Sequence, residues 1–409
     1  MFTLKYFLGD RFERMNEIID SFNSMESNYI NLEACCSYPF NSVLEAQKAP
    51  IYLLPTEGTV GNRYFPNMDS IEQIDIYAEE LLLNIFGLTK NNYCATTQPH
   101  SGTQANQIVY NAILNDGDTV ISLDPKSGGH ISHNKFAKRI HIKNYSLTVN
   151  NEINYEEIEI LTKKYNPKLV IIGASSFANS IDYQRIINIA HNNNSLVLVD
   201  ICHTVLYVLG KRYPSPFPNA DFVTFTMDKT LRGPQGGILI YKNEFSKKIN
   251  YSIFPQTQGG PLQSLQFAKL ACLIELNNID LSKYAKDVQN NAKIMNEYLI
   301  SKGISTFSTD NSTHIVLINT KQFGLTGQEA EDLLFKNHIL ANKNIIPYDS
   351  ELPNITSGIR LGTTFITNQS YKKSDIEELS EYIAQTLLDK KVDKTYINFI
   401  NKYNINSAN

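Results

Sequence analysis

An acid and a lysine follow two apolar, β-type runs near the middle of the chain. Residues 195–203 read SLVLVDICH and residues 223–237 read VTFTMDKTLRGPQGG, so Asp200 and Lys229 stand at or just beyond the ends of these runs. In α/β sheets the carboxyl ends of parallel strands meet at one crevice, where polar groups face a ligand. The pattern therefore predicts one site that contains Asp200, Lys229 and also His203, three residues beyond the acid.

This combination of groups suits pyridoxal phosphate chemistry. A lysine forms a Schiff base with that cofactor, and a carboxylate keeps the pyridine nitrogen protonated so that the ring can accept electrons. Taken alone, the pair also fits a helix cap and a solvated loop charge. The segment GPQGG after the lysine leads tightly into a third apolar run, ILIYK, which places Lys229 on a short excursion between strands. That placement favours the cofactor interpretation.

A phosphate anchor is predicted in residues 98–114, which read QPHSGTQANQIVYNAIL. A Pro/Gly/Ser turn precedes apolar residues at helical spacing, so Ser101, Gly102 and Thr103 lie at a helix start. Free N–H groups and the positive end of the helix dipole bind phosphate there, although an ordinary serine cap has the same appearance. The glycine pair in TQGGP, residues 257–261, offers further backbone amides or simply a turn.

The chain resembles the serine hydroxymethyltransferase family through nine segments in the family's order, between about residue 30 and about residue 385. Each is modest alone, but nine in one order are specific. The segments are QPHSGTQAN, GGHISH, PKLVIIGAS, VDICH, KTLRGPQGG, FPQTQGGP, GLTG, ANKNIIP and TSGIRLGT. The resemblance implies an α/β fold of the fold type I, aspartate aminotransferase-like class, with a mainly parallel sheet in the large domain and a smaller C-terminal α+β domain.

The resemblance also assigns the cofactor contacts. Lys229 would hold pyridoxal phosphate covalently, Asp200 would pair with the pyridine nitrogen, and His130 would stack on the ring and take part in catalysis. The remaining cofactor contacts would be Ser175 and His203 at the phenolic oxygen, Ser101, Gly102 and Thr103 at the phosphate, and Gly259 and Gly260 from a neighbouring subunit.

The substrate contacts implied by the resemblance lie in other parts of the chain. Arg360 would grip the amino-acid carboxylate with its planar, bidentate guanidinium. Glu57 would transfer a proton at the substrate hydroxyl and would come from the other subunit of a dimer. Cys35 and Phe65 stand at substrate-binding positions, and Asn344 would face the pterin of tetrahydrofolate.

The departures from the family pattern are concentrated in the pocket. Where the family reads Ser-Glu-Asn-Tyr, residues 35–38 of this chain are Cys-Cys-Ser-Tyr, and Pro55 and Phe65 each stand in place of a tyrosine. Asp228 replaces the histidine before the lysine, and Gln235 replaces an arginine. Each of these last two changes makes the pocket more negative by about one charge, which is costly in a buried setting. Asp228 could be protonated, pair with the Schiff-base nitrogen, or bind a cationic group of a substrate.

The folate side differs as well. Pro125 stands where the family usually has a leucine at the pterin face, the segment after GGHISH is shorter, and Tyr348 departs from the family pattern after Pro347. Tetrahydrofolate is therefore a doubtful cofactor. The residues expected to bind the cofactor, the arginine expected to bind the substrate carboxylate (Arg360) and Glu57 are retained. These groups suffice for chemistry at the Cα of an amino acid.

Composition excludes several other classes. A chain of 409 residues with 42% hydrophobic content can bury a large core, and a net charge of −4 gives no nucleic-acid or membrane footprint. No apolar run approaches the roughly 18–20 residues that span a bilayer, and charges interrupt the first apolar segment before a signal-peptide core forms. We expect a cytoplasmic protein. The five cysteines show no paired C-x-x-C spacing, so the sequence predicts neither a disulfide framework nor a metal site.

Three parts are expected along the chain. They are an N-terminal arm (1–50), a pyridoxal-phosphate-binding large domain (51–278) that opens with a strong helical pattern at 69–87, and a small C-terminal domain (279–409). The Asn-rich tail, 394–409, is either a partner contact or a frayed end.

The expected function is a hydroxymethyltransferase-like or aldolase-type transfer at the Cα–Cβ bond of a β-hydroxy amino acid, which interconverts serine, threonine and glycine. The expected assembly is a homodimer or a dimer of dimers. A folate-independent threonine aldolase or transaldolase, which moves a glycine unit to another aldehyde, is the alternative within this class. A catalytically silent regulatory or binding protein with the same fold is the alternative from another class.

Overall fold

The computed structural model describes residues 13–391 except 137 and 311. The Asn-rich tail therefore lies outside the described residues. Among the helices that are described, none combines the length and apolar character needed to cross a bilayer.

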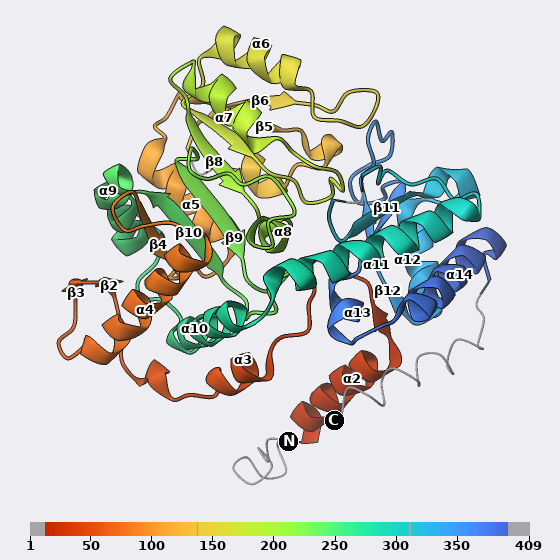
Figure 1. The fold of residues 1–409 in the computed structure, drawn as a ribbon, viewed down its shortest axis with the longest axis horizontal. Helices are drawn as coiled ribbons and strands as arrows, with labels where there is room; N and C mark the ends of the chain where they lie inside the picture. The colour runs from red at the N-terminus through yellow and green to blue at the C-terminus, as the bar shows by residue number, and fades with distance from the viewer. Residues whose placement is uncertain (1–12, 137, 311, 392–409) are drawn as a thin grey trace.

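A mixed sheet of seven strands forms the centre of the larger part of the molecule (Figure 1). Five neighbouring strands are parallel, and β10 runs antiparallel to both of its neighbours. In spatial order the strands are β4 (Tyr93–Thr96), β10 (Gly237–Lys242), β9 (Phe222–Thr226), β8 (Leu196–Asp200), β7 (Leu169–Ile172), β5 (Thr119–Leu123) and β6 (His141–Tyr145). This arrangement confirms the predicted α/β class with a mainly parallel sheet.

Helices cover both faces of this sheet because its central strands are apolar on both sides. On β7, Val170 and Ile172 belong to one core while Leu169 and Ile171 belong to another, as the two-residue period of a strand requires. The first core includes side chains of α3 (Asn41–Ala46), α4 (Asp69–Ile85), α6 (Tyr155–Tyr165), α7 (Tyr183–His191), α8 (Val205–Leu209) and α10 (Gln263–Asn278). The other face packs against α5 (Gly102–Ile113) and α9 (Ser246–Tyr251).

A smaller part with its own core lies beside the large sheet. Its three antiparallel strands are ordered β11 (Ile315–Asn319), β14 (Gly358–Gly362) and β13 (Asn342–Asn344). The N-terminal strand β1 (Ile30–Asn31) pairs in parallel with β12 (Ile339–Leu340), which ties the start of the described chain to this part. Its core includes side chains of α11 (Leu281–Ser301), α12 (Gly327–Lys336), α13 (Thr364–Asn368) and α14 (Lys373–Asp389), and α2 (Glu13–Asn28) precedes β1.

Helix α11 connects the two parts (Figure 1). Ala285 and Val288 belong to the core of the large sheet, whereas Ala292 and Leu299 belong to the core of the smaller part. One continuous helix therefore fixes the position of the small sheet relative to the large one. The three-part division expected from the sequence, with a boundary near residue 279, stays a prediction.

Candidate active site

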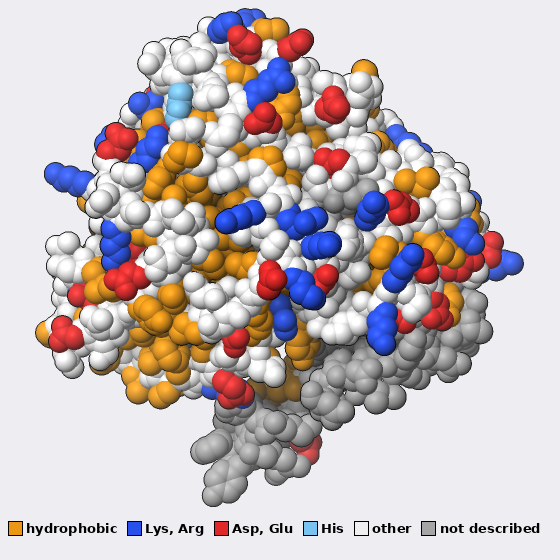
Figure 2. All heavy atoms as spheres, in the orientation of Figure 1, with side chains coloured by type: hydrophobic (Ala, Val, Ile, Leu, Met, Phe, Trp, Pro, Cys, Tyr) orange, Lys and Arg blue, Asp and Glu red, His pale blue; other side chains and the backbone are white. Residues whose placement is uncertain are grey.

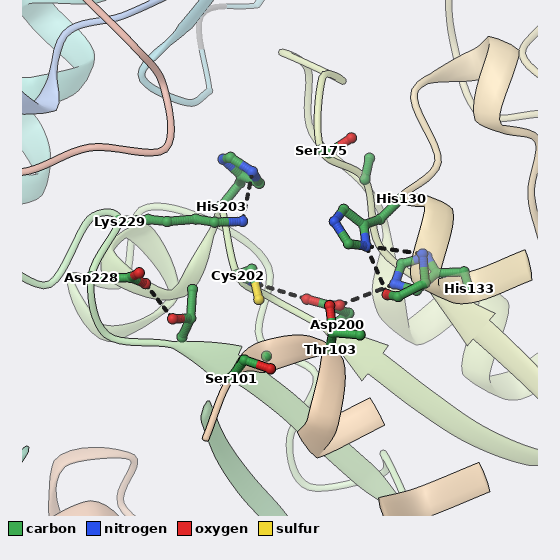
Figure 3. Close-up of a pocket in the computed structure, with 14 residues that line it drawn as sticks. Ser101, Thr103, His130, His133, Ser175, Asp200, Cys202, His203, Asp228 and Lys229 are labelled. Carbon is green, nitrogen blue, oxygen red and sulfur yellow. Dashed lines mark hydrogen bonds and ion pairs between the residues drawn. The ribbon is translucent and has the colours of Figure 1, made fainter. Parts of the chain in front are cut away.

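A cavity of about 210 Å³ lies at the carboxyl ends of β8 and β9. Figure 3 shows the side chains of Lys229, His130 and Asp200 directed toward one space. A second cavity of about 450 Å³ shares part of this lining and extends toward the small sheet. The lining of the first includes eight predicted cofactor contacts, namely Ser101, Gly102, Thr103, His130, Ser175, Asp200, His203 and Lys229.

The strand ends explain why an acid and a lysine meet here. Asp200 is the last residue of β8 and lies opposite Thr224 of β9, while β9 ends three residues before Lys229. The chain then returns as β10, with Gly237 opposite Thr226, which confirms the predicted short excursion.

Asp200 is a buried anion held by three donors. Its Oδ2 atom accepts hydrogen bonds from Nδ2 of Asn106 at 2.9 Å and Nε2 of His133 at 3.0 Å, and its Oδ1 atom accepts one from the backbone N–H of Cys202 at 3.1 Å. Burial by itself raises the pKa of this carboxyl, but the hydrogen bonds and the charge of His133 lower the pKa to well below its usual range. Asp200 is therefore ionised at neutral pH, as a partner for a protonated ring nitrogen must be.

The amine of Lys229 contacts a buried histidine. Its Nζ atom lies 3.0 Å from Nε2 of His203, and burial, followed by the charge of Lys229, holds the pKa of His203 well below its usual value. The ring of His203 stacks on His314 with centroids 5.6 Å apart. Nε2 of His314 donates to the carbonyl of Ala34 at 2.9 Å, so this pair links the lysine to the segment that carries Cys35.

Helix α5 begins at the edge of the cavity. Ser101 is its N-cap and accepts a hydrogen bond from the backbone N–H of Gln104 at 3.1 Å. The N–H groups of Gly102 and Thr103 are in the first turn and have no partner within the helix. A Cβ at Gly102 would lie 3.1 Å from Sγ of Cys202, so a larger residue there would crowd the cavity. These features fit a seat for phosphate.

His130 enters the cavity from the start of the 3₁₀ segment η4 (Ile131–Asn134). Its Nδ1 atom lies 2.7 Å from Oγ of Ser132, which fixes the orientation of the ring. Burial lowers the pKa of His130 to about 4. The imidazole is therefore neutral near pH 7, which is compatible with stacking on an aromatic cofactor.

Asp228 lines the cavity and accepts a hydrogen bond from Oγ1 of Thr226. A buried lysine amine lies close enough to interact with this carboxyl group. It belongs to Lys269 of α10, which is 2% exposed and whose Nζ donates to the carbonyls of Pro99 at 2.9 Å and Gly237 at 3.2 Å. Burial lowers the pKa of Lys269 to about 7, against the opposing attraction of Asp75 and Asp228.

Gly236 makes room for that lysine. Its φ is +141°, and a Cβ at this position would lie 2.1 Å from Cε of Lys269. The second glycine of GPQGG is thus required by a close approach of the buried lysine stem.

Arg360 reaches the second cavity from β14 and is 9% exposed. Its NH1 group donates to the carbonyl of Ser175 at 2.5 Å, and Nε donates to Oδ1 of Asn342 at 3.2 Å. Two hydrogen bonds to neutral oxygens position the guanidinium without neutralising its charge, which leaves it suited to an anion. Cys35 and Asn344 line the same cavity.

The remaining predicted residues lie elsewhere in this chain. Glu57, Phe65, Gly259 and Gly260 are not among the residues that line the two cavities. Glu57 precedes the small hairpin of β2 (Gly58–Thr59) and β3 (Asn62–Arg63). A Cβ at Gly259 would lie 3.3 Å from Oε1 of Glu57, so the two residues are neighbours. The carbonyl of Gly260 is 3.3 Å from Nε2 of His100. Glu57 and the glycine pair therefore form one group outside the cavity of their own subunit.

Sequence reasoning missed four residues that hold the site. They are Asn106 and His133 at Asp200, His314 at His203, and Lys269 beneath the loop after Lys229. The GGHISH segment carried a usable signal, because a second histidine follows His130 by three residues. The family resemblance assigns His133 and His314 no role, but both are fully buried against site residues.

The donor set fits pyridoxal phosphate. A buried carboxylate, a lysine amine and a helix N-terminus line one cavity. Among the described residues, the buried Nδ1 atom of His203, whose ring lines this cavity, has no hydrogen-bond partner.

The comparisons with known proteins agree with this donor set. A family model described as serine hydroxymethyltransferase matches residues 8–383. A serine hydroxymethyltransferase of Bordetella avium (strain 197N) is 38% identical over 366 residues, which cover 88% of this chain and 87% of that protein. One of Polynucleobacter necessarius subsp. necessarius (strain STIR1) is 36% identical over 391 residues, which cover 95% and 94%. The chain therefore belongs to the serine hydroxymethyltransferase family of fold type I, pyridoxal-phosphate-dependent transferases.

Proposed function

We propose that this enzyme holds pyridoxal phosphate on Lys229 and interconverts serine and glycine by making or breaking the Cα–Cβ bond of a β-hydroxy-α-amino acid. The main observation in support is that Lys229, Asp200 and the N-terminus of α5 line one cavity. When bound, the cofactor supplies an electron sink for negative charge that develops at Cα. The ionised Asp200 would hold a proton on the ring nitrogen.

Arg360 would bind the substrate carboxylate. It lines a cavity that also contains Lys229, so a carboxylate at the guanidinium would bring the amino group of the same amino acid toward the lysine. His203, kept neutral by burial, would accept a hydrogen bond at Nε2 from Nζ of Lys229, 3.0 Å away, and so orient the amine. Asp228, beside Thr226, would hold or transfer a proton or bind a cationic group near the lysine.

A second copy of this chain would complete the site. Glu57 lies beside Gly259, outside the cavity of its own chain, which supports their supply to a partner's cavity. Exposed hydrophobic side chains gather in the region of α3, α4 and α10, at the lower left of Figure 2. They include Leu44, Tyr52, Leu53, Leu54, Tyr77 and Leu262. A large exposed apolar area of this kind favours an interface between subunits.

Tetrahydrofolate dependence is proposed to be weak. Pro125 and Asn344 both line the second cavity, so the replacement of a leucine by Pro125 changes the surface that a pterin would meet. Proline removes both a flexible apolar side chain and a backbone N–H donor.

Cleavage assays with and without tetrahydrofolate test this proposal. We expect the purified holoenzyme to form glycine from a β-hydroxy amino acid, with little stimulation of serine cleavage by the folate. Threonine serves as the folate-independent reference substrate. If the enzyme cleaves neither serine nor threonine, the proposed function is contradicted. Strong stimulation of serine cleavage by tetrahydrofolate would contradict only the proposed weak dependence on folate.

A further inference from the structure

A tight turn brings three potential metal ligands together near Arg360, the residue proposed to bind the substrate carboxylate. The backbone N–H of Cys36 donates to the carbonyl of Glu33 at 3.0 Å, which closes the turn 33–36. Sγ of Cys36 lies 3.3 Å from Oε2 of Glu33, and one ligand atom from each of Glu33, Cys35 and Cys36 lies within 4.8 Å of the other two. We propose that these three residues bind a thiophilic divalent cation such as Zn²⁺, and that the bound cation hinders amino-acid binding at Arg360.

The spacing of the three atoms suits tetrahedral coordination. With Zn–S near 2.3 Å and Zn–O near 2.0–2.2 Å, neighbouring ligand atoms of a tetrahedral site are about 3.5–3.8 Å apart. The cluster therefore needs a contraction of no more than about 1.3 Å, and rotations of exposed or half-buried side chains supply it. Three protein ligands leave a fourth position that a water molecule fills.

The ligand types select the class of ion. Two cysteine sulfurs and one carboxylate favour zinc or cadmium over the hard ions calcium and magnesium, which bind through oxygen. Cys35 is exposed and Cys36 is half-buried, so a cation can reach the sulfurs from solvent. Adjacent cysteines with a carboxylate two residues earlier do not follow paired C-x-x-C spacing, so that spacing did not predict this cluster.

The surrounding charges balance an occupied site. Two thiolates and a carboxylate carry three negative charges, and a divalent cation leaves one. Arg360 interacts electrostatically with Glu33, Cys35 and Cys36, and its positive charge compensates the remainder. Cys35 and Arg360 line the same cavity, so a hydrated cation held at Cys35 would occupy space beside the guanidinium that the substrate carboxylate needs. The family pattern has Ser-Glu at the positions of Cys35 and Cys36, so the site would be a property of this chain rather than of the pattern.

Metal binding is tested directly on the reduced holoenzyme. Cd²⁺ is titrated into wild type, Cys36→Ser, Glu33→Gln and Cys94→Ser while the ultraviolet thiolate-to-metal absorbance is recorded. Cys94→Ser is the matched control, because Cys94 is half-buried near Asn243 and Ser246, in another part of the fold. We expect the absorbance band in wild type and Cys94→Ser, and affinity lowered by about tenfold or more in Cys36→Ser and Glu33→Gln. The absence of a band in wild type, or an equal affinity in Cys36→Ser, would refute the site.

The effect on substrate binding is a separate measurement. This half of the proposal rests on the proposed function, since it assumes that Arg360 binds the substrate carboxylate. Zn²⁺ should raise the KM for serine several-fold in wild type and Cys94→Ser and leave it nearly unchanged in Cys36→Ser. If Cd²⁺ binds but Zn²⁺ leaves the KM of wild type unchanged, the coupling to Arg360 is wrong. A failure of the proposed function itself would give a different result. In that case Arg360→Ala, measured without metal, would bind serine with unchanged affinity.

Discussion

Nε2 of His133 lies 3.0 Å from Oδ2 of Asp200, although the two residues are 67 positions apart in the chain. Asn106 donates to the same oxygen and in turn accepts a hydrogen bond from Oγ1 of Thr224 at 2.6 Å. Charge-assisted hydrogen bonds of this kind hold a carboxylate both ionised and oriented. The acid proposed to face the pyridine nitrogen is therefore fixed before any ligand binds.

Replacement of Arg360 should weaken amino-acid binding while the cofactor stays bound. A charge-assisted hydrogen bond contributes about 1.5–3 kcal/mol, so Arg360→Ala should lower serine affinity by roughly tenfold to more than a hundredfold. Spectral titration of the holoenzyme with serine measures this affinity. Arg185→Ala, on the outer helix α7, is the control and should bind serine normally. Unchanged affinity in Arg360→Ala would remove the guanidinium from the substrate site.

Asp228 distinguishes this pocket from the family pattern, and Asp228→Asn tests what it does. If the carboxyl transfers a proton, turnover should fall by about 10² to 10⁴ with a modest effect on cofactor binding. If it binds a cationic substrate group, the loss should fall on affinity and be selective for that substrate. Steady-state kinetics across several amino acids separates these results, with Asp287→Asn on the exposed side of α11 as the control. Near-wild-type kinetics for every active substrate would show that Asp228 has neither role.

Mixed subunits test whether Glu57 acts across a dimer. Lys229→Ala and Glu57→Ala are each expected to be inactive, but a heterodimer of the two contains one intact composite site. Random reassortment should then restore about a quarter of wild-type activity, because half of the dimers are mixed and each has one sound site of two. A mixture of Lys229→Ala and Arg360→Ala is the control, since both residues belong to the same subunit's cavity. No recovery in the first mixture, despite subunit exchange, would place Glu57 outside a shared site.

His314 should make the protein less stable in acid. Burial lowers the pKa of His314 to about 3, against a usual value near 6.5. Between these values the unfolded chain binds a proton that the folded chain excludes, so stability falls as pH decreases from about 6.5 toward 3. His314→Gln should reduce this loss by about a few kcal/mol.

Urea unfolding at a series of pH values measures that difference. His141→Gln is the matched control, because His141 is exposed on β6. An equal pH dependence of the unfolding midpoint in wild type and His314→Gln would contradict the assignment of acid sensitivity to this buried imidazole.

The cofactor side of the site could be predicted because its residues follow local patterns. Asp200 ends an apolar strand, Lys229 precedes a glycine-rich return, and Ser101 caps a helix, so each position is visible within a few residues. Lys269 could not be predicted in this way, since a lysine within a helix is usually solvated. Its burial follows from the docking of α10 against the loops at Pro99 and Gly236.

The other residues depend on features that simple sequence patterns do not show. His314 reaches Ala34 only because the small sheet packs beside the large one. The Glu33, Cys35 and Cys36 cluster depends on the local turn at 33–36, and pairwise cysteine spacing does not describe that turn. The proposed partner contributions of Glu57 and Gly259 lie beyond what one chain can display.

The most direct test of the account is to locate the lysine that holds pyridoxal phosphate. Borohydride reduction of the purified enzyme, followed by proteolysis and mass spectrometry, fixes the cofactor to its attachment residue. We predict that the pyridoxyl group is found on Lys229, that it is absent from Lys229→Ala, and that it is retained in the conservative control Lys126→Ala at the exposed turn after β5. A pyridoxyl group on Lys269 or any other lysine, or none on the wild-type enzyme after incubation with the cofactor, would contradict the proposed site.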